Sequence, residues 1–346
     1  MFRFVWRLCA LLAFASPLVA GDTRMNPDLS LNGLFEWAAG NRGNDPVADH
    51  KNGLSVKEIE LQIASDIDPY LRGNAMLSFS QDPLGAWGVE PEEAFVESLD
   101  LQGVTFKGGK FLAAFGKQNG IHRHAWAFID APLASQALIG DEGFKDVGVS
   151  ASFLVPAPIF LELTTQAFNP PADSPLFGSP TPEDWAGLGA LRTLLDLNDD
   201  TTLELSGSYL AGRNATEDRT WLGNVSAYLK WRKNETRAWI LAGELLHREV
   251  ESSPTRSLDA QGGMSGWLQW QFARQWWAQG RAEMLGLSGP TVPQVRKYSA
   301  LLALAPTEFS GWRLQYDWIE SQVNDPEHRL TLQLNVTMGV HPAHSY

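Results

Sequence analysis

The stretch from Arg329 to Met338, RLTLQLNVTM, alternates strictly between polar and apolar residues. Leucine, valine and methionine occupy the even-numbered positions, while arginine, threonine, glutamine and asparagine occupy the odd-numbered ones. Successive side chains of an extended strand point to opposite faces. This stretch therefore predicts a long strand with one apolar face and one polar face.

The same period of two recurs upstream, most clearly at 309–319, 275–285 and 221–232. Strands of soluble proteins average about 5–6 residues, whereas membrane barrels need about 9–11 residues to cross the bilayer. The predicted strands are about twice the soluble length, which favours a barrel. We expect about sixteen strands, at 29–38, 55–67, 70–81, 92–101, 104–116, 146–156, 159–168, 186–197, 200–212, 219–232, 236–249, 261–272, 275–287, 296–305, 309–320 and 328–339.

The predicted connections alternate between short turns and longer links, as in outer-membrane barrels. The longer links are at 39–54, 82–91, 117–145, 169–185, 213–218, 250–260, 288–295 and 321–327. An even number of strands returns both chain ends to one side of the membrane. The sequence therefore predicts an all-β fold, a transmembrane antiparallel up-and-down β-barrel, formed by residues 21–346 as one domain.

The composition excludes several other classes of protein. The chain of 346 residues has 17 Phe, 14 Trp and 6 Tyr, which is more apolar surface than a disordered chain carries. A net charge of −13 disfavours nucleic acid as a partner. A single Cys excludes a disulfide scaffold, and no apolar run of about 18 residues follows the first 20. Tryptophans near strand ends fit an aromatic girdle; the alternative is the core of a large soluble β-protein.

Residues 1–20 have the features of a secretory signal peptide. Arg3 and Arg7 supply a basic start, Leu8 to Ala15 forms a short apolar core, and Ala20 is a small residue at the expected cleavage point. A membrane anchor is the alternative. Cleavage removes two positive charges, so the mature chain carries 25 − 40 = −15. We expect the outer membrane of a Gram-negative bacterium as the destination.

One block of sequence resembles the phosphate-selective porin family. It runs from Val104-Thr105-Phe106-Lys107-Gly108-Gly109-Lys110-Phe111 through Ala114-Phe115-Gly116-Lys117 to Phe128-Ile129-Asp130 and Asp146-Val147-Gly148-Val149. The chain also resembles porin-like outer-membrane proteins with a W-x-F-[IV]-D … G-D-E-G loop and a His-containing tail, some of which are labelled zinc-regulated. The family resemblance implies a pore with surplus Lys and Arg. This chain departs from that pattern because its expected inward faces carry both signs of charge.

The longest link, 117–145, is expected to fold into the barrel and narrow it, by analogy with porin-like barrels. His122 and His124, together with carboxylates of this loop, are candidate ligands for a divalent cation such as Zn²⁺. The alternative is that these residues only anchor the loop to the wall. The candidate constriction residues are His122, Arg123, His124, Trp126, Asp130, Asp141 and Glu142.

Charged residues of both signs are expected on the inward faces of the strands, where they would influence ion preference. These lumen residues are Glu58, Glu60, Arg72, Lys110, Lys230, Arg232, Arg281, Glu283, Arg313, Asp317 and Arg329. The tail at 340–346 ends in an aromatic residue, which we expect the barrel-assembly machinery to recognise. His341 and His344 of this tail are weaker candidates for a metal site.

No catalytic motif is evident, so the sequence predicts no enzyme and no required cofactor. The predicted function is a porin, a water-filled channel for passive diffusion of small hydrophilic solutes or ions, with weak cation preference. The alternatives are an anion- or phosphate-selective porin and a zinc-related receptor that binds without open conductance. The expected partners are outer-membrane lipid, lipopolysaccharide, small solutes and ions. A homotrimer is one possible oligomeric state of the barrel.

Overall fold

The computed structural model describes residues 27–42, 52–82, 85–171, 174, 176–178, 181, 183–251, 258–288 and 293–339. The predicted signal peptide (1–20) and the tail (340–346), with His341 and His344, lie outside the described residues. None of the helices in the described part of the chain has the length and apolarity needed to span a membrane.

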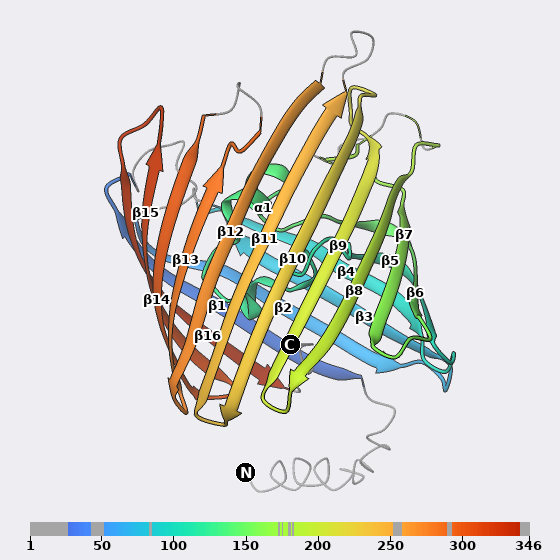
Figure 1. Ribbon diagram of the computed structural model, residues 1–346, viewed down its shortest axis with the longest axis horizontal. Helices are drawn as coiled ribbons and strands as arrows, with labels where there is room; N and C mark the ends of the chain where they lie inside the picture. The colour runs from blue at the N-terminus through green and yellow to red at the C-terminus, as the bar shows by residue number, and fades with distance from the viewer. Residues whose placement is uncertain are drawn as a thin grey trace, which may run out of the picture.

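Sixteen antiparallel strands form one closed barrel in which each strand pairs with its neighbours in sequence, and β1 pairs with β16 (Figure 1). The all-β up-and-down barrel of sixteen strands is therefore confirmed. The strands are β1 (Asp28–Gly40), β2 (Gly53–Asp66), β3 (Leu71–Gln81), β4 (Trp87–Ser98), β5 (Val104–Leu112), β6 (Lys145–Leu154), β7 (Phe160–Phe168), β8 (Ala186–Asn198), β9 (Thr201–Arg213), β10 (Arg219–Asn234), β11 (Arg237–Glu251), β12 (Leu258–Ala273), β13 (Trp276–Leu285), β14 (Val295–Thr307), β15 (Ser310–Ser321) and β16 (Glu327–Gly339).

The alternation read from the last strand appears in the barrel as an inward polar face and an outward apolar face. Arg329, Thr331 and Gln333 are buried, with 7%, 5% and 0% of their surface exposed, whereas Leu330 and Leu332 are 36% and 37% exposed. This is the reverse of a soluble protein, in which leucine is buried and arginine is exposed. An outer surface of this kind suits contact with lipid chains.

Aromatic side chains gather at the end of the barrel that carries the short hairpin turns. Trp239 stacks on Trp270 with ring centroids 5.2 Å apart, and Phe272 continues the series toward Trp276. All four rings are exposed on the outer surface. Such a belt is typical of the level where a barrel leaves the hydrocarbon layer, because amphipathic rings prefer the headgroup boundary.

The fourth strand differs most from its predicted bounds, since it covers 87–98 rather than 92–101. The expected long link at 82–91 is shortened by a tight turn, in which Asp82 accepts hydrogen bonds from the backbone of Gly85 and Ala86. Pro91 is accommodated inside the strand because a β-bulge at Glu92 relaxes the ladder there. The predicted strand 104–116 likewise ends earlier, at Leu112, where the chain turns into the lumen.

The connection between β5 and β6 lies within the barrel rather than outside it. It contains the short 3₁₀ helices η2 (Gln118–Gly120) and η3 (Arg123–Ala125) and the helix α1 (Leu133–Leu138), which packs against β11, β12 and β13 (Figure 1). Its apolar residues form a core with inward side chains of the wall and with two residues of the link between β7 and β8: Phe111, Ala113, Phe115, Ala134, Leu138, Ile139, Phe144, Phe168, Leu176, Phe177, Ala186, Leu188, Leu210, Leu222 and Leu246.

Candidate functional site

The inward loop has little regular structure, so its backbone polar groups need partners inside the barrel. Wall side chains supply several of them. The backbone N–H of Ala114 donates to Gln166 (2.8 Å), and that of Gly116 donates to Ser208 (3.0 Å). Further along, Arg313 donates to the carbonyl of Trp126 at 2.7 Å. The loop is therefore held by the polar face that the period-two pattern places inside.

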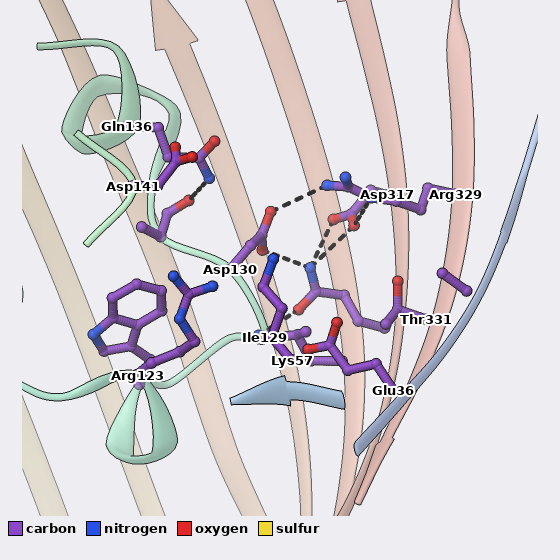
Figure 2. Close-up of a pocket in the computed structure, with 14 residues that line it drawn as sticks. Glu36, Lys57, Arg123, Ile129, Asp130, Gln136, Asp141, Asp317, Arg329 and Thr331 are labelled. Atoms are coloured by element: carbon purple, nitrogen blue, oxygen red, sulfur yellow. Dashed lines mark hydrogen bonds and ion pairs between the residues drawn. The ribbon is translucent and has the colours of Figure 1, made fainter. Parts of the chain in front are cut away.

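Asp130 is the most heavily contacted residue of the loop on the wall formed by β13–β16 (Figure 2). Its carboxylate accepts hydrogen bonds from Arg281 (2.7 Å), Gln315 (2.8 Å) and Arg329 (3.2 Å), and it also pairs with Lys297. These residues come from four consecutive strands. One carboxylate of the loop thus ties together four neighbouring strands.

The charges around Asp130 determine its protonation. Burial raises the pKa of the Asp130 carboxyl, but Lys297, Arg281 and Arg329 outweigh burial and hold that pKa well below its usual range. Asp130 is therefore ionised at neutral pH. In return it neutralises part of the positive charge of this wall, on which Asp317 also pairs with Arg329 (3.3 Å).

A second contact forms where the loop meets β2 and β4. Four buried carboxylates of these strands face the loop, with exposed fractions between 3% and 8%: Glu58, Glu60, Glu92 and Glu93. Two consecutive residues of β4 face inward because the bulge at Glu92 interrupts the alternation. Arg123 lies 3.5 Å from Glu58, and Lys145, at the start of β6, lies 3.3 Å from Glu92.

His122 projects from the loop into this carboxylate cluster. Its Nε2 lies 3.1 Å from Glu93 Oε2, and its Nδ1 lies 3.7 Å from Glu92 Oε1 and 4.0 Å from Glu60 Oε1. Burial lowers the pKa of His122, but its carboxylate neighbours outweigh burial and hold that pKa well above the usual range. The neighbouring His124 contacts Glu60 through Nδ1, and the two imidazole rings lie parallel with centroids 6.0 Å apart.

Asn119 closes the base of the loop. Its side-chain nitrogen donates to the carbonyls of Ala113 (2.7 Å) and Phe144 (3.0 Å), and its oxygen accepts from the N–H of Phe144 (2.7 Å). Gly143 has a positive φ of 76°, and a Cβ added there would lie 2.3 Å from Asn119 Oδ1. A larger residue at 143 would therefore meet both backbone strain and a direct clash.

Cavities lie on either side of the loop. One of about 80 Å³ lies toward the ends of β1, β15 and β16 that carry the long links, and Lys57, Arg123, Asp130 and Arg329 are among its lining residues (Figure 2). A larger one of about 500 Å³ lies between residues 112–122 and the wall formed by β4–β9. Its wall is rich in hydroxyl and charged groups: Glu93, Glu97, Thr105, Lys107, Ser150, Ser152, Glu162, Thr164, Gln166, Arg192, Glu204, Ser206 and Ser208.

The structure places the candidate loop residues in these contacts. Trp126 is 8% exposed and donates from Nε1 to the carbonyl of Ile121 at 2.7 Å, so it stiffens the loop itself. Asp141 lines the smaller cavity, and Glu142 pairs with Lys145 at 2.7 Å. The carboxylates that face the two histidines come from β2 and β4, however, and not from the loop.

The candidate lumen residues fall into two groups. Those that face the loop are buried on its contact surface: Glu58, Glu60, Arg281, Glu283, Arg313, Asp317 and Arg329. Lys110 was wrongly predicted to face the lumen: it lies in register with the outward Val147 and pairs with Glu90 at 3.0 Å, whereas Lys107 of the same strand lines the larger cavity. Arg72, Lys230 and Arg232 continue the inward faces toward the short turns.

Several residues of the site were missed by reading the sequence: Glu92, Glu93, Asn119, Lys145, Lys297 and Gln315. The alternation could have found Lys297 and Gln315, which occupy regular inward positions on β14 and β15. It could not have found Glu92 and Glu93 together, because a bulge interrupts the alternation at this pair.

The chain matches no family model. An uncharacterized protein of Aquifex aeolicus (strain VF5) is 26% identical over 365 residues, which cover 92% of this chain and 75% of that protein. Among solved structures, an anion-selective porin from Comamonas acidovorans is similar over 90% of this chain and 100% of its own chain, with a TM-score of 0.63 and 9% identity. OprB of Pseudomonas putida covers 90% of this chain and 94% of its own, with a TM-score of 0.67 and 11% identity. The chain therefore has the fold of porins, while a specific likeness to phosphate-selective porins is not among these findings.

Proposed function

We propose that the protein is a porin of the outer membrane of a Gram-negative bacterium, through which small hydrophilic solutes and ions diffuse passively. The observation that carries this proposal is the combination of an apolar outer surface with a hydrophilic lumen that a folded loop narrows but does not fill. A cavity of about 500 Å³ lined by hydroxyl and charged groups remains beside the loop. Such a wall replaces part of the hydration of a small polar solute.

The charges that line the smaller cavity support weak preference for cations. The larger cavity is lined by four carboxylates (Glu93, Glu97, Glu162, Glu204) and three permanently cationic side chains (Lys107, Lys117, Arg192). The smaller cavity is lined by four carboxylates (Glu36, Asp130, Asp141, Asp317) and three cationic side chains (Lys57, Arg123, Arg329). The smaller cavity thus has an excess of one carboxylate, 4 − 3, which attracts cations weakly. In the larger cavity the protonated ring of His122 balances the fourth carboxylate.

Anion or phosphate selectivity is the second candidate, favoured by the basic side chains of β13–β16. Asp130 alone contacts three of them, Arg281, Lys297 and Arg329, which lowers the net positive charge of that wall. We therefore rank anion selectivity below cation preference for this chain.

Planar bilayer recordings test the proposal. The refolded protein is expected to give stepwise conductance, and a salt gradient is expected to give a reversal potential of the sign for cation preference. A reversal potential of the opposite sign would favour the anion-selective alternative, and block by inorganic phosphate would favour phosphate as its solute. Complete absence of conductance from a correctly folded barrel would refute the channel and favour a binding barrel.

A further inference from the structure

We infer that the loop and the barrel wall together form a binding site for one divalent transition-metal cation, with Glu60, Glu92 and His122 as its ligands. One ligand atom from each of these residues lies within 4.8 Å of the other two. Glu60 is on β2, Glu92 is on β4, and His122 is on the inward loop. The ion would therefore join two strands of the wall to the loop, beyond what diffusion through the channel requires.

The distances between these atoms are too long for hydrogen bonds but are close to those between ligand atoms that bind the same metal ion. His122 Nδ1 lies 3.7 Å from Glu92 Oε1 and 4.0 Å from Glu60 Oε1, which is too far for a hydrogen bond. Two ligand atoms of a tetrahedral zinc ion, each about 2.0–2.2 Å from the metal, lie roughly 3.3–3.6 Å apart. The His122–Glu92 distance is close to that spacing, whereas Glu60, at 4.0 Å from His122 Nδ1 and within 4.8 Å of Glu92, would move inward on binding.

The orientation of the His122 ring also fits a metal ligand. Glu93 Oε2 lies 3.1 Å from Nε2, and because an ionised carboxylate only accepts hydrogen bonds, Nε2 carries the proton of this bond. In the neutral imidazole that a metal ion requires, Nδ1 would then face the other two carboxylates with its lone pair. An imidazole that binds a metal through one nitrogen and donates from the other to a carboxylate is a recurrent arrangement in metalloproteins.

The carboxylates facing Nδ1 have few neighbours that donate to them: Lys145 donates to Glu92 Oε1, and His124 is paired with Glu60. Both oxygens of Glu60 and Oε2 of Glu92 are buried and accept no hydrogen bond from the part of the chain that the structure describes. Glu60 is only 3% exposed. Buried carboxylate oxygens without donors are costly, and a cation among them removes that cost.

The charge balance of the cluster indicates a divalent ion. With Glu58, Glu60, Glu92 and Glu93 ionised and both histidines neutral, the cluster has four negative charges against the two permanent positive charges of Arg123 and Lys145, which leaves 4 − 2 = 2. A divalent cation neutralises this remainder. Mixed imidazole and carboxylate ligands favour zinc and similar ions over calcium or magnesium, which prefer oxygen alone.

The rival arrangement is a cluster neutralised by protons on His122 and His124, the latter in contact with Glu60. Zn²⁺ titration calorimetry on the folded full-length barrel, purified without a histidine tag, distinguishes the two. Glu60→Gln and His122→Ala are expected to lose one equivalent of bound Zn²⁺ relative to the unsubstituted protein. Glu93→Gln keeps all three ligands but replaces the charged acceptor that orients His122 with a neutral amide oxygen, so we expect affinity about tenfold weaker.

Glu204→Gln is the matched control, because it removes the same charge from the lumen at a residue that pairs with Lys117 instead. It is expected to keep the full stoichiometry and affinity. Heat-modifiable migration on gels verifies that each variant is folded. Absence of saturable Zn²⁺ binding at micromolar concentrations, or binding by Glu60→Gln equal to that of the control, would overturn the inference. This measurement does not depend on conductance, so its failure is distinct from failure of the proposed channel.

Discussion

Arg281 donates a 2.7 Å hydrogen bond from Nη2 to the carboxylate of Asp130, and a second, of 2.9 Å from Nη1, to the Asp130 backbone carbonyl. The two residues are 151 positions apart in the chain. Arg281 is 4% exposed, so this contact is shielded from water. This contact fixes the position of the inward loop relative to the wall.

Asp130→Asn keeps the shape of the side chain but removes the charge that Arg281, Lys297 and Arg329 share. Removing one partner of a buried ion pair leaves the others poorly compensated. We expect the substitution to weaken docking of the loop by roughly 2–4 kcal/mol. Urea-induced unfolding of the refolded barrel measures the loss, and single-channel conductance should become larger and noisier. An unchanged unfolding midpoint together with unchanged conductance would contradict this role.

The same carboxylate predicts a pH dependence. Because its folded-state pKa is depressed, ionised Asp130 contributes its full stabilisation above its unfolded-state pKa of about 3.9. That stabilisation is lost as the pH falls from there through the folded-state pKa. The difference in stability between the unsubstituted protein and Asp130→Asn should therefore be constant near neutrality and shrink below about pH 4. Unfolding midpoints across an acid series check this, and a difference that grows with acid would be inconsistent with it.

A comparison of two glycines tests the closure of the loop. Gly143→Ala places a methyl group against Asn119 at a backbone with φ 76°, whereas Gly120 has no heavy atom within 4 Å of an added Cβ and no positive φ. We expect Gly143→Ala to destabilise the loop by about 1–3 kcal/mol and Gly120→Ala to have little effect. Limited proteolysis of the folded barrel reports the difference. Equal cleavage of the two variants would argue against Asn119 as the clamp of the loop.

Two variants that each neutralise one charge of an ion pair test ion preference in the larger cavity. Lys117 and Glu204 line it with their charged groups 3.1 Å apart, and each side chain is at most 20% exposed. Glu204→Gln is expected to move the reversal potential under a salt gradient toward anion preference, and Lys117→Gln toward cation preference. The two shifts should have opposite signs and should weaken at high salt, because screening shortens the range of each charge. No shift in either variant would indicate that the ion path avoids this cavity, and shifts of the same sign would contradict the electrostatic role of the pair.

Most of the barrel could be predicted because each strand carries its own pattern. Leu330 and Leu332 face outward and Arg329 and Thr331 inward as a direct consequence of extended geometry, whatever the rest of the chain does. The bounds of β4 were predicted less well. The tight turn at Asp82 and the bulge at Glu92 depend on how β3 and β4 pair, and a one-residue irregularity changes which side chains face inward.

The sequence alone determined the class of fold, the number of strands and the polarity of each face, since these follow from a local period of two. It also identified His122, His124 and Asp130 as residues of the inward loop. Only the tertiary structure decided their partners: closure of the barrel brings Arg281, Lys297 and Arg329 around Asp130, and Glu60 and Glu92 around His122. Contacts between residues of different strands and the loop depend on the register of all the strands between them, and no local pattern encodes that register.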